Sequence, residues 1–173
     1  MSNKNTKYKF TIVFFIIGFI LANISMISIN ESTVNHDSVE IYKLKKEFIS
    51  HKVNIKTNLK YKIIHGSTSI KDIDQDFERK LVKFGYEKSI YHLETLNEII
   101  QTLNSIGNGI APFNTSCLPT YRYIIIYKKN DKITKIVKIC TSCFKNEVIT
   151  KNERTELLLF IADYEILEKM FEK

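Results

Sequence analysis

The chain has 173 residues, of which 44% are hydrophobic, a size and composition suited to one packed domain with a tail. Five Gly and two Pro are too few for collagen-like repeats or long disordered linkers. The formal net charge is +7, but the lysines are scattered and no Arg-rich helix is present. The charge therefore fits a surface facing anionic lipid headgroups better than a nucleic-acid-binding surface, and no nucleic-acid partner is expected.

The first 29 residues predict a basic cytoplasmic tail followed by a membrane segment. Lys4, Lys7 and Lys9 precede a run of uncharged residues at 10–29, FTIVFFIIGFILANISMISI. As a helix rising about 1.5 Å per residue, this run spans roughly 30 Å, the thickness of a bilayer's hydrocarbon core. Basic residues ahead of an apolar run hold the N-terminus in the cytoplasm, so we expect the rest of the chain to be exported.

Two interpretations of this segment remain open, an uncleaved anchor and a cleaved signal peptide. Signal-peptide cleavage requires small residues at positions −3 and −1, and Ala22 is followed two positions later by Ile24. The length of the run also favours an anchor. We expect a single-pass cell-membrane protein with its C-terminal domain outside the cytoplasm, or a secreted or periplasmic protein if cleavage occurs.

Residues 30–38 are polar and predict a linker, which leaves residues 39–173 as a single exported domain. Residues 39–44 and 59–65 alternate loosely between apolar and polar, as half-buried strands do. Residues 45–58 fit neither pattern.

Two amphipathic helices are predicted next. In the first, Ser69 and Asp72 resemble a capping box and Gly85 is a stop signal. Its apolar stripe, at three- and four-residue spacing, consists of Ile70, Ile73, Phe77, Leu81 and Phe84. The second covers residues 93–106 and ends at Gly107; its core face consists of Leu93, Leu96, Ile99, Ile100, Leu103 and Ile106.

The C-terminal third contains the strongest β-strand signal. Residues 121–129 and 132–140 are both rich in residues that favour strands, and they flank Asn130-Asp131, which predicts a hairpin with a two-residue turn. After it we expect a short strand at 156–161 and a helix capped by Asp163. The predicted fold is α+β: an antiparallel sheet of four or five strands with two or three helices packed on one side.

Three cysteines are the main functional candidates. If Lys129 faces Lys132 across the predicted turn, Cys140 faces Tyr121 and Cys143 faces Leu118, the neighbour of Cys117. All three thiols are therefore expected at the open end of the hairpin.

Several uses of this cluster remain open. Cys117 can form a disulfide with Cys140 or with Cys143, typically worth about 2–4 kcal/mol of stability. A zinc ion needs a fourth ligand, and the histidines show no ligand spacing. Cys140-Thr141-Ser142-Cys143 matches the spacing of a thiol redox motif but follows a strand rather than opening a helix. The last alternative is three reduced thiols packed as small apolar groups.

The pattern Cys117-x-Pro119-x-x-Arg122, an Ile-rich strand, then Ile139-Cys140-x-x-Cys143 resembles a group of small bacterial proteins, many of them exported. The likeness covers roughly residues 90–172, and Thr141 stands where an aromatic residue is usual. The group has no established activity. The resemblance implies that Cys117, Arg122, Cys140 and Cys143 form one site.

Arg122 has two interpretations. By strand alternation it shares a face with Ile124 and Ile126, where it could simply extend from a sheet edge. Beside the thiols, it could instead bind an anion or a carboxylate.

No GxSxG, Walker A, HExxH or GxGxxG motif is present. The sequence therefore favours a non-enzymatic envelope domain that binds a protein or other envelope partner and uses its cysteines structurally. A thiol-disulfide redox protein acting through Cys140 and Cys143, and a small metal-binding domain, are the alternatives.

Overall fold

The computed structural model describes residues 36–49, 59–105, 109–112 and 116–172. The predicted tail and membrane segment at 1–29, most of the linker, and the predicted helix stop at Gly107 lie outside the described residues. No helix among the described residues is long and apolar enough to cross a bilayer.

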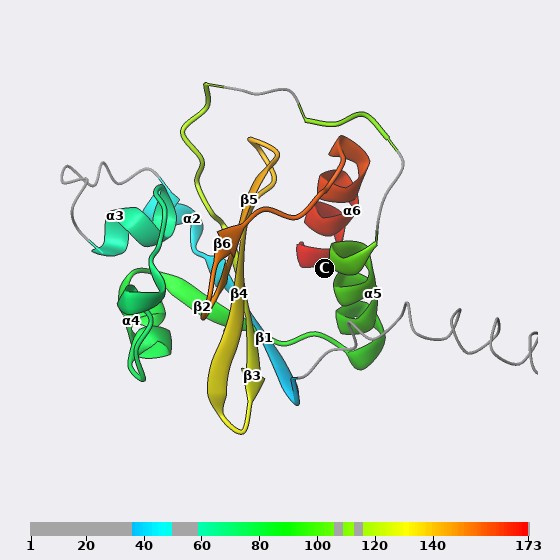
Figure 1. The fold of residues 1–173 in the computed structure, drawn as a ribbon. Coiled ribbons are helices and arrows are strands. Elements are labelled where there is room, and N and C mark those ends of the chain that lie inside the picture. The colour runs from blue at the N-terminus through cyan, green and yellow to red at the C-terminus, as the bar shows by residue number, and fades with distance from the viewer. Residues whose placement is uncertain (1–35, 50–58, 106–108, 113–115, 173) are drawn as a thin grey trace, which may run out of the picture. The chain divides into compact units, whose positions relative to one another are not determined.

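An antiparallel sheet forms the centre of the domain, in the order β2-β1-β3-β4-β5-β6 (Figure 1). The strands are β1 (Ser38–Leu44), β2 (Tyr86–Ser89), β3 (Tyr123–Lys129), β4 (Lys132–Cys140), β5 (Lys145–Thr150) and β6 (Arg154–Thr155). The described part of the chain is therefore α+β, as predicted, with two short strands, β2 and β6, at the edges of the sheet.

Helices cover both faces of the sheet, so the prediction that they pack on one side is wrong (Figure 1). One face packs against α5 (Leu93–Asn104) and α6 (Ile161–Phe171). The other packs against α3 (Leu59–Ile64) and α4 (Phe77–Lys83), with α2 (Lys46–Ile49) nearby. The sequence of β3 already indicated a sheet covered on both faces, because it contains three adjacent isoleucines, Ile124, Ile125 and Ile126. All three are fully buried. A strand with one solvent-exposed face alternates between apolar and polar residues, whereas a strand covered on both faces is continuously apolar.

The predicted hairpin is confirmed as β3 and β4. Asn130 and Asp131 have φ angles of 50° and 59°, the left-handed pair that a two-residue hairpin turn requires. The Asp37 carboxylate accepts the backbone N–H of Asn130 at 2.9 Å, which ties the turn to the start of β1.

The predicted register holds at the turn but not along the whole hairpin. Lys129 pairs with Lys132, but an irregularity between Tyr127 and Lys128 shifts the pairing by one, so that Tyr127 faces Lys135. A bulge of this kind adds a residue to one strand and cannot be read from the hydrophobic pattern.

Residues 59–65 were predicted as a strand and instead contain the helix α3. The residues that it buries are Ile63 and Ile64, which are adjacent and so lie on one side of a helix but on opposite faces of a strand. A six-residue segment with mixed Lys and apolar residues is too short for periodicity to separate the two structures.

The first predicted helix is interrupted. Its start is a 3₁₀ turn, η1 (Ile70–Asp72), where the Asp72 carboxylate accepts the Ser69 N–H at 3.0 Å, as expected for the capping pair. The helix resumes as α4 and ends before Gly85, whose φ of 101° and close approach to the Phe48 ring leave no room for a side chain.

The second predicted helix is confirmed as α5, which buries Ile99 and Leu103. At the C-terminus, β6 lies earlier than the strand predicted at 156–161. The predicted helix is present as α6, where Asp163 acts in the capping box: its carboxylate accepts the N–H of Phe160, the N-cap, at 2.8 Å.

Candidate functional site

Cys117 and Cys143 lie at disulfide distance, with their Cα atoms 6.1 Å apart and a sequence separation of 26. Cys117 is exposed in the segment that leads into β3, and Cys143 is buried in the turn between β4 and β5. The pair therefore fastens the incoming segment to the sheet. Of the two disulfides left open by the sequence, the structure contains the one to Cys143.

Cys140, at the end of β4, is a free and fully buried thiol. It shares a small core cluster with Tyr121 and Cys143, so the three cysteines do gather at the open end of the hairpin. The sulfur accepts the backbone N–H of Thr120 at 3.3 Å and lies 3.4 Å from the Ser142 hydroxyl. These contacts hold Cys140 as part of the packing beneath the disulfide.

The arrangement of the CxxC segment bears on redox chemistry. A redox dithiol needs its two sulfurs free to pair with each other and one of them open to attack. Cys143 is engaged with Cys117, and Cys140 has no exposed surface. The CxxC segment is also followed by the strand β5 and not by a helix, so it lacks the helix N-terminus that would stabilise a thiolate.

Arg122 lies just before β3, where strand alternation no longer applies. Its Nη1 is 3.8 Å from Glu168 on α6, and its Nη2 is 3.2 Å from Glu172, the residue that follows this helix. The guanidinium lies 5.6 Å from the centre of the Tyr123 ring. The side chain therefore binds carboxylates of the domain itself and packs against the helix on the opposite face from Ile124.

A second polar cluster, around Lys138, was not predicted from the sequence. The Lys138 ammonium group is almost fully buried and lies 2.8 Å from Glu147 across the β4–β5 pair. It also donates to the carbonyl oxygens of Gly66 and Lys62, at 2.6 and 3.1 Å, and to the Thr68 hydroxyl at 3.0 Å. We call Lys138, Glu147 and these three residues the Lys138 network.

Two further side chains enclose the Lys138 network. The Tyr121 ring centre lies 4.1 Å from the Lys138 Nζ, close enough for a cation–π interaction. Arg154 approaches the other carboxylate oxygen of Glu147, with its Nε at 3.6 Å. Burial lowers the pKa of Lys138 to about 8, although the Glu147 carboxylate acts in the opposite direction. Because its N–H donors are engaged and its surface is covered, Lys138 has a structural role.

The Lys138 network was not predicted from the sequence because the strand β5 was not predicted. Lys145, Asn146 and Glu147 break the apolar pattern, yet Asn146 and Glu147 are buried and satisfied by partners distant in the sequence. Only the β4–β5 pairing would have placed a lysine and a glutamate directly opposite each other.

Among the described residues, no group of three or more His, Cys, Asp or Glu side chains is arranged to hold a metal ion. His65 lies near the cysteine segment, where its Nδ1 is 3.1 Å from the Pro119 carbonyl oxygen and 3.3 Å from the Thr120 hydroxyl. It thus connects α3 to the residues that follow the disulfide. In comparisons with known proteins, no family model, no curated protein and no solved structure matched this chain.

Proposed function

We propose that this chain is an exported envelope protein whose α+β domain binds a partner, without catalysis, outside the cytoplasm. Residues 10–29 would direct the domain to the membrane and hold it there, or be removed on export. The Cys117–Cys143 disulfide would stabilise the domain in its oxidising compartment.

The observation that carries this proposal is the Cys117–Cys143 pair. Disulfides persist in oxidising compartments such as a periplasm or cell exterior and are rare in a reducing cytoplasm. The pair therefore agrees with the export predicted from the basic tail and the apolar run, two features that are independent of the cysteines.

A binding role is favoured over thiol chemistry by the state of the CxxC segment. Cys143 is occupied by Cys117, and Cys140 is buried beneath it. The disulfide then acts as a staple, which supports a rigid surface rather than a reaction.

The proposal can be tested on the full chain recovered from a membrane fraction. Unfolded samples are alkylated before and after reduction, and the intact mass is measured. We expect one alkylated cysteine before reduction and three after it. Three alkylated cysteines before reduction would overturn the disulfide and the oxidising location that it supports. The mass also reports whether residues 1–29 are retained, which separates the anchored form from the released one.

Two matched variants sharpen this measurement. Cys140→Ala should leave no cysteine alkylated before reduction, because the remaining two pair with each other. Cys117→Ser should leave two thiols alkylated. If Cys140 and Cys143 are instead protected in Cys117→Ser, they can pair with each other, and the structural role gives way to thiol redox chemistry.

A further inference from the structure

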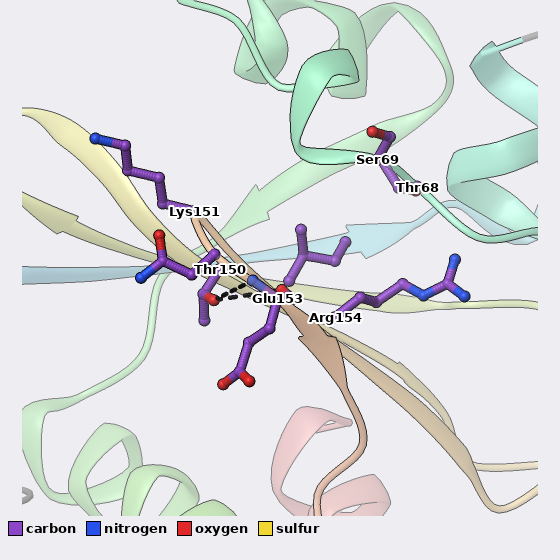
Figure 2. A pocket seen from close by; sticks show the side chains of 8 residues that line it. Thr68, Ser69, Thr150, Lys151, Glu153 and Arg154 are labelled. Carbon is purple, nitrogen blue, oxygen red and sulfur yellow. Dashed lines mark hydrogen bonds between the residues drawn. The ribbon is translucent and has the colours of Figure 1, made fainter.

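A polar pocket lies between the segment after α3 and the turn that joins β5 to β6. Its volume is about 390 Å³, within the range of small-molecule sites. It is lined by Thr68, Ser69, Ile149, Thr150, Lys151, Asn152, Glu153 and Arg154. Figure 2 shows Thr68 and Ser69 on one side and the β5–β6 turn on the other.

The lining of this pocket is positively charged on balance, with Lys151 and Arg154 against Glu153. The Glu153 side chain is directed away from Thr68 and Ser69, whereas Lys151 and Arg154 extend to either side of the turn (Figure 2). Lys151 has no hydrogen-bond or ion-pair partner within the described parts of the chain. Two cations therefore flank the same opening, Arg154 held by Glu147 and Lys151 without a partner among the described residues.

Arg154 is held in a way that suits anion binding. Its Nε faces Glu147 at 3.6 Å, and about 58% of its side chain is exposed. Within the described residues its two Nη groups have no partner. A guanidinium presents paired donors that match the geometry of a carboxylate or a phosphate.

The walls of the pocket are fixed by the domain. The Thr150 hydroxyl donates to the Glu153 carbonyl oxygen and accepts the Glu153 N–H, at 3.3 and 3.2 Å, while the Thr150 N–H donates to the same carbonyl at 2.9 Å. On the facing side, Thr68 is bonded to Lys138 and Glu147 of the Lys138 network. A site that is already ordered loses less conformational entropy when a ligand binds.

We propose that this pocket binds the oxyanion group, phosphate or carboxylate, of a small ligand, with Arg154 as the main contact and Lys151 as the second. The Ser69 hydroxyl and the Asn152 amide line the same pocket and supply further donors. This inference deepens the proposed binding role, because it names the chemistry of one ligand. It rests on that proposal only for the compartment in which the ligand would be met.

The test is binding of inorganic phosphate and of acetate to the full chain in detergent, measured by titration calorimetry at constant ionic strength. We expect saturable binding of one anion per chain. Arg154→Gln should weaken binding at least about tenfold, because a charge-assisted pair of hydrogen bonds is lost. Arg154→Lys keeps the charge but not the paired guanidinium donors, so its affinity should be intermediate.

Lys151→Gln should weaken binding about two- to fivefold, as expected for a single exposed charge. Lys132→Gln is the matched control, since it removes one charge from the hairpin turn at the start of β4. Its affinity should equal that of the natural chain. Equal weakening in all three Gln variants would show a general charge effect and overturn the site, as would the absence of saturable binding of either anion.

The source of the anion is distinguished by a second ligand. Glycerol phosphate that binds more tightly than inorganic phosphate supports a headgroup-like ligand, and equal affinities support the free anion. Circular dichroism melting of each variant confirms that binding is compared between folded proteins. Since export and the disulfide are determined separately by mass, failure of the titration removes this inference and leaves the proposed location intact.

Discussion

Two ionic clusters lie on the same face of the sheet and differ in their access to water. On the β2-β1-β3 half, Glu40 binds Lys88 at 2.9 Å and Lys128 at 3.0 Å, and Lys128 also binds Glu78 at 2.8 Å. The Tyr42 hydroxyl lies 3.0 Å from the Glu40 carboxylate and 3.2 Å from that of Glu78, and its single proton can be donated to one of them at a time. On the β4–β5 half, the Lys138 network encloses a single buried cation.

The difference between the two clusters is in how each charge is neutralised. Glu40 is shared among Lys88, Lys128 and Tyr42, of which Lys88 is exposed, so the remaining partners and water can compensate for the loss of one. Lys138 has one carboxylate, two backbone carbonyls and a hydroxyl in place of water. Removing a partner from the first cluster should therefore cost little, whereas removing one from the second leaves an uncompensated buried charge.

The largest expected effect is that of Glu147→Gln. It leaves the Lys138 ammonium group buried without a carboxylate, which should lower the free energy of unfolding by about 3–5 kcal/mol. Urea denaturation followed by circular dichroism measures the loss, and Glu153→Gln, an exposed neighbour, is the control.

A double variant completes the test of the Lys138 network. Lys138→Met with Glu147→Leu removes both charges and should recover most of the lost stability. If the double variant is as unstable as Glu147→Gln, the cost lies in packing and not in the unpaired charge.

The next effect is that of removing the disulfide. Cys117→Ser with Cys143→Ser opens a loop with a sequence separation of 26, which should cost about 3 kcal/mol. Since the released segment carries Tyr121 over Lys138, hydrogen exchange should accelerate first in β4 and β5. Cys140→Ala, which keeps the disulfide, is the matched control; uniform acceleration across the sheet would refute the link between the disulfide and the Lys138 network.

A change of pH above 8 should have a smaller effect on the free energy of unfolding. Burial lowers the pKa of Lys138 to about 8, from 10.5 in the unfolded chain. Between these values the unfolded state binds more protons, so stability should rise by about 1–2 kcal/mol from pH 8 to pH 10.

Above pH 10 this gain should reverse, because burial raises the pKa values of Tyr86 and Tyr127 and the unfolded chain loses phenolic protons first. Urea midpoints across this range measure both trends. The Lys138→Met, Glu147→Leu variant should lack the rise, and a rise that persists in it would assign the effect to other groups.

The smallest effect is that of Glu40→Gln. Burial alone would raise the pKa of Glu40, but hydrogen bonds from Lys88, Lys128 and Tyr42 outweigh it and lower the pKa to about 2. The ionised carboxylate thus stabilises the fold above about pH 4.5, and this contribution is lost as the pH falls toward 2.

Because the cluster around Glu40 is partly solvated and several cations share its charge, Glu40→Gln should cost less at neutral pH than any of the changes above. The difference from the natural chain should vanish below about pH 2. A loss as large as that of Glu147→Gln would remove the distinction between the two halves of the sheet.

Local signals predicted the parts of this fold that depend on neighbouring residues. Asn130-Asp131 predicted the hairpin because few other residues adopt two successive left-handed conformations. The stripe of α5 and the stop at Gly85 were predicted for similarly local reasons. The gathering of the cysteines followed from the hairpin, although a bulge shifted its register by one.

The parts that were missed depend on distant partners. Asn146 is buried in β5 because its amide bonds the backbone of Leu157 and the hydroxyl of Tyr164. No hydrophobic pattern reveals a strand whose buried positions are polar. Arg122 was assigned to the other face for a related reason, since its carboxylate partners lie some fifty residues away, on α6 and directly after it.

The position of β1 in the sheet also determines the order in which the domain can fold. β1 is the first of the described strands to be made, yet its two neighbours are β2 and β3, and the Asp37 contact to the hairpin turn joins residues 93 apart. A growing chain therefore carries β1 with one side unpaired until residues 123–128 of β3 have been synthesised. Closing such long loops is slow, and an unpaired apolar strand promotes aggregation, so this chain should depend on a holding chaperone while it is being made.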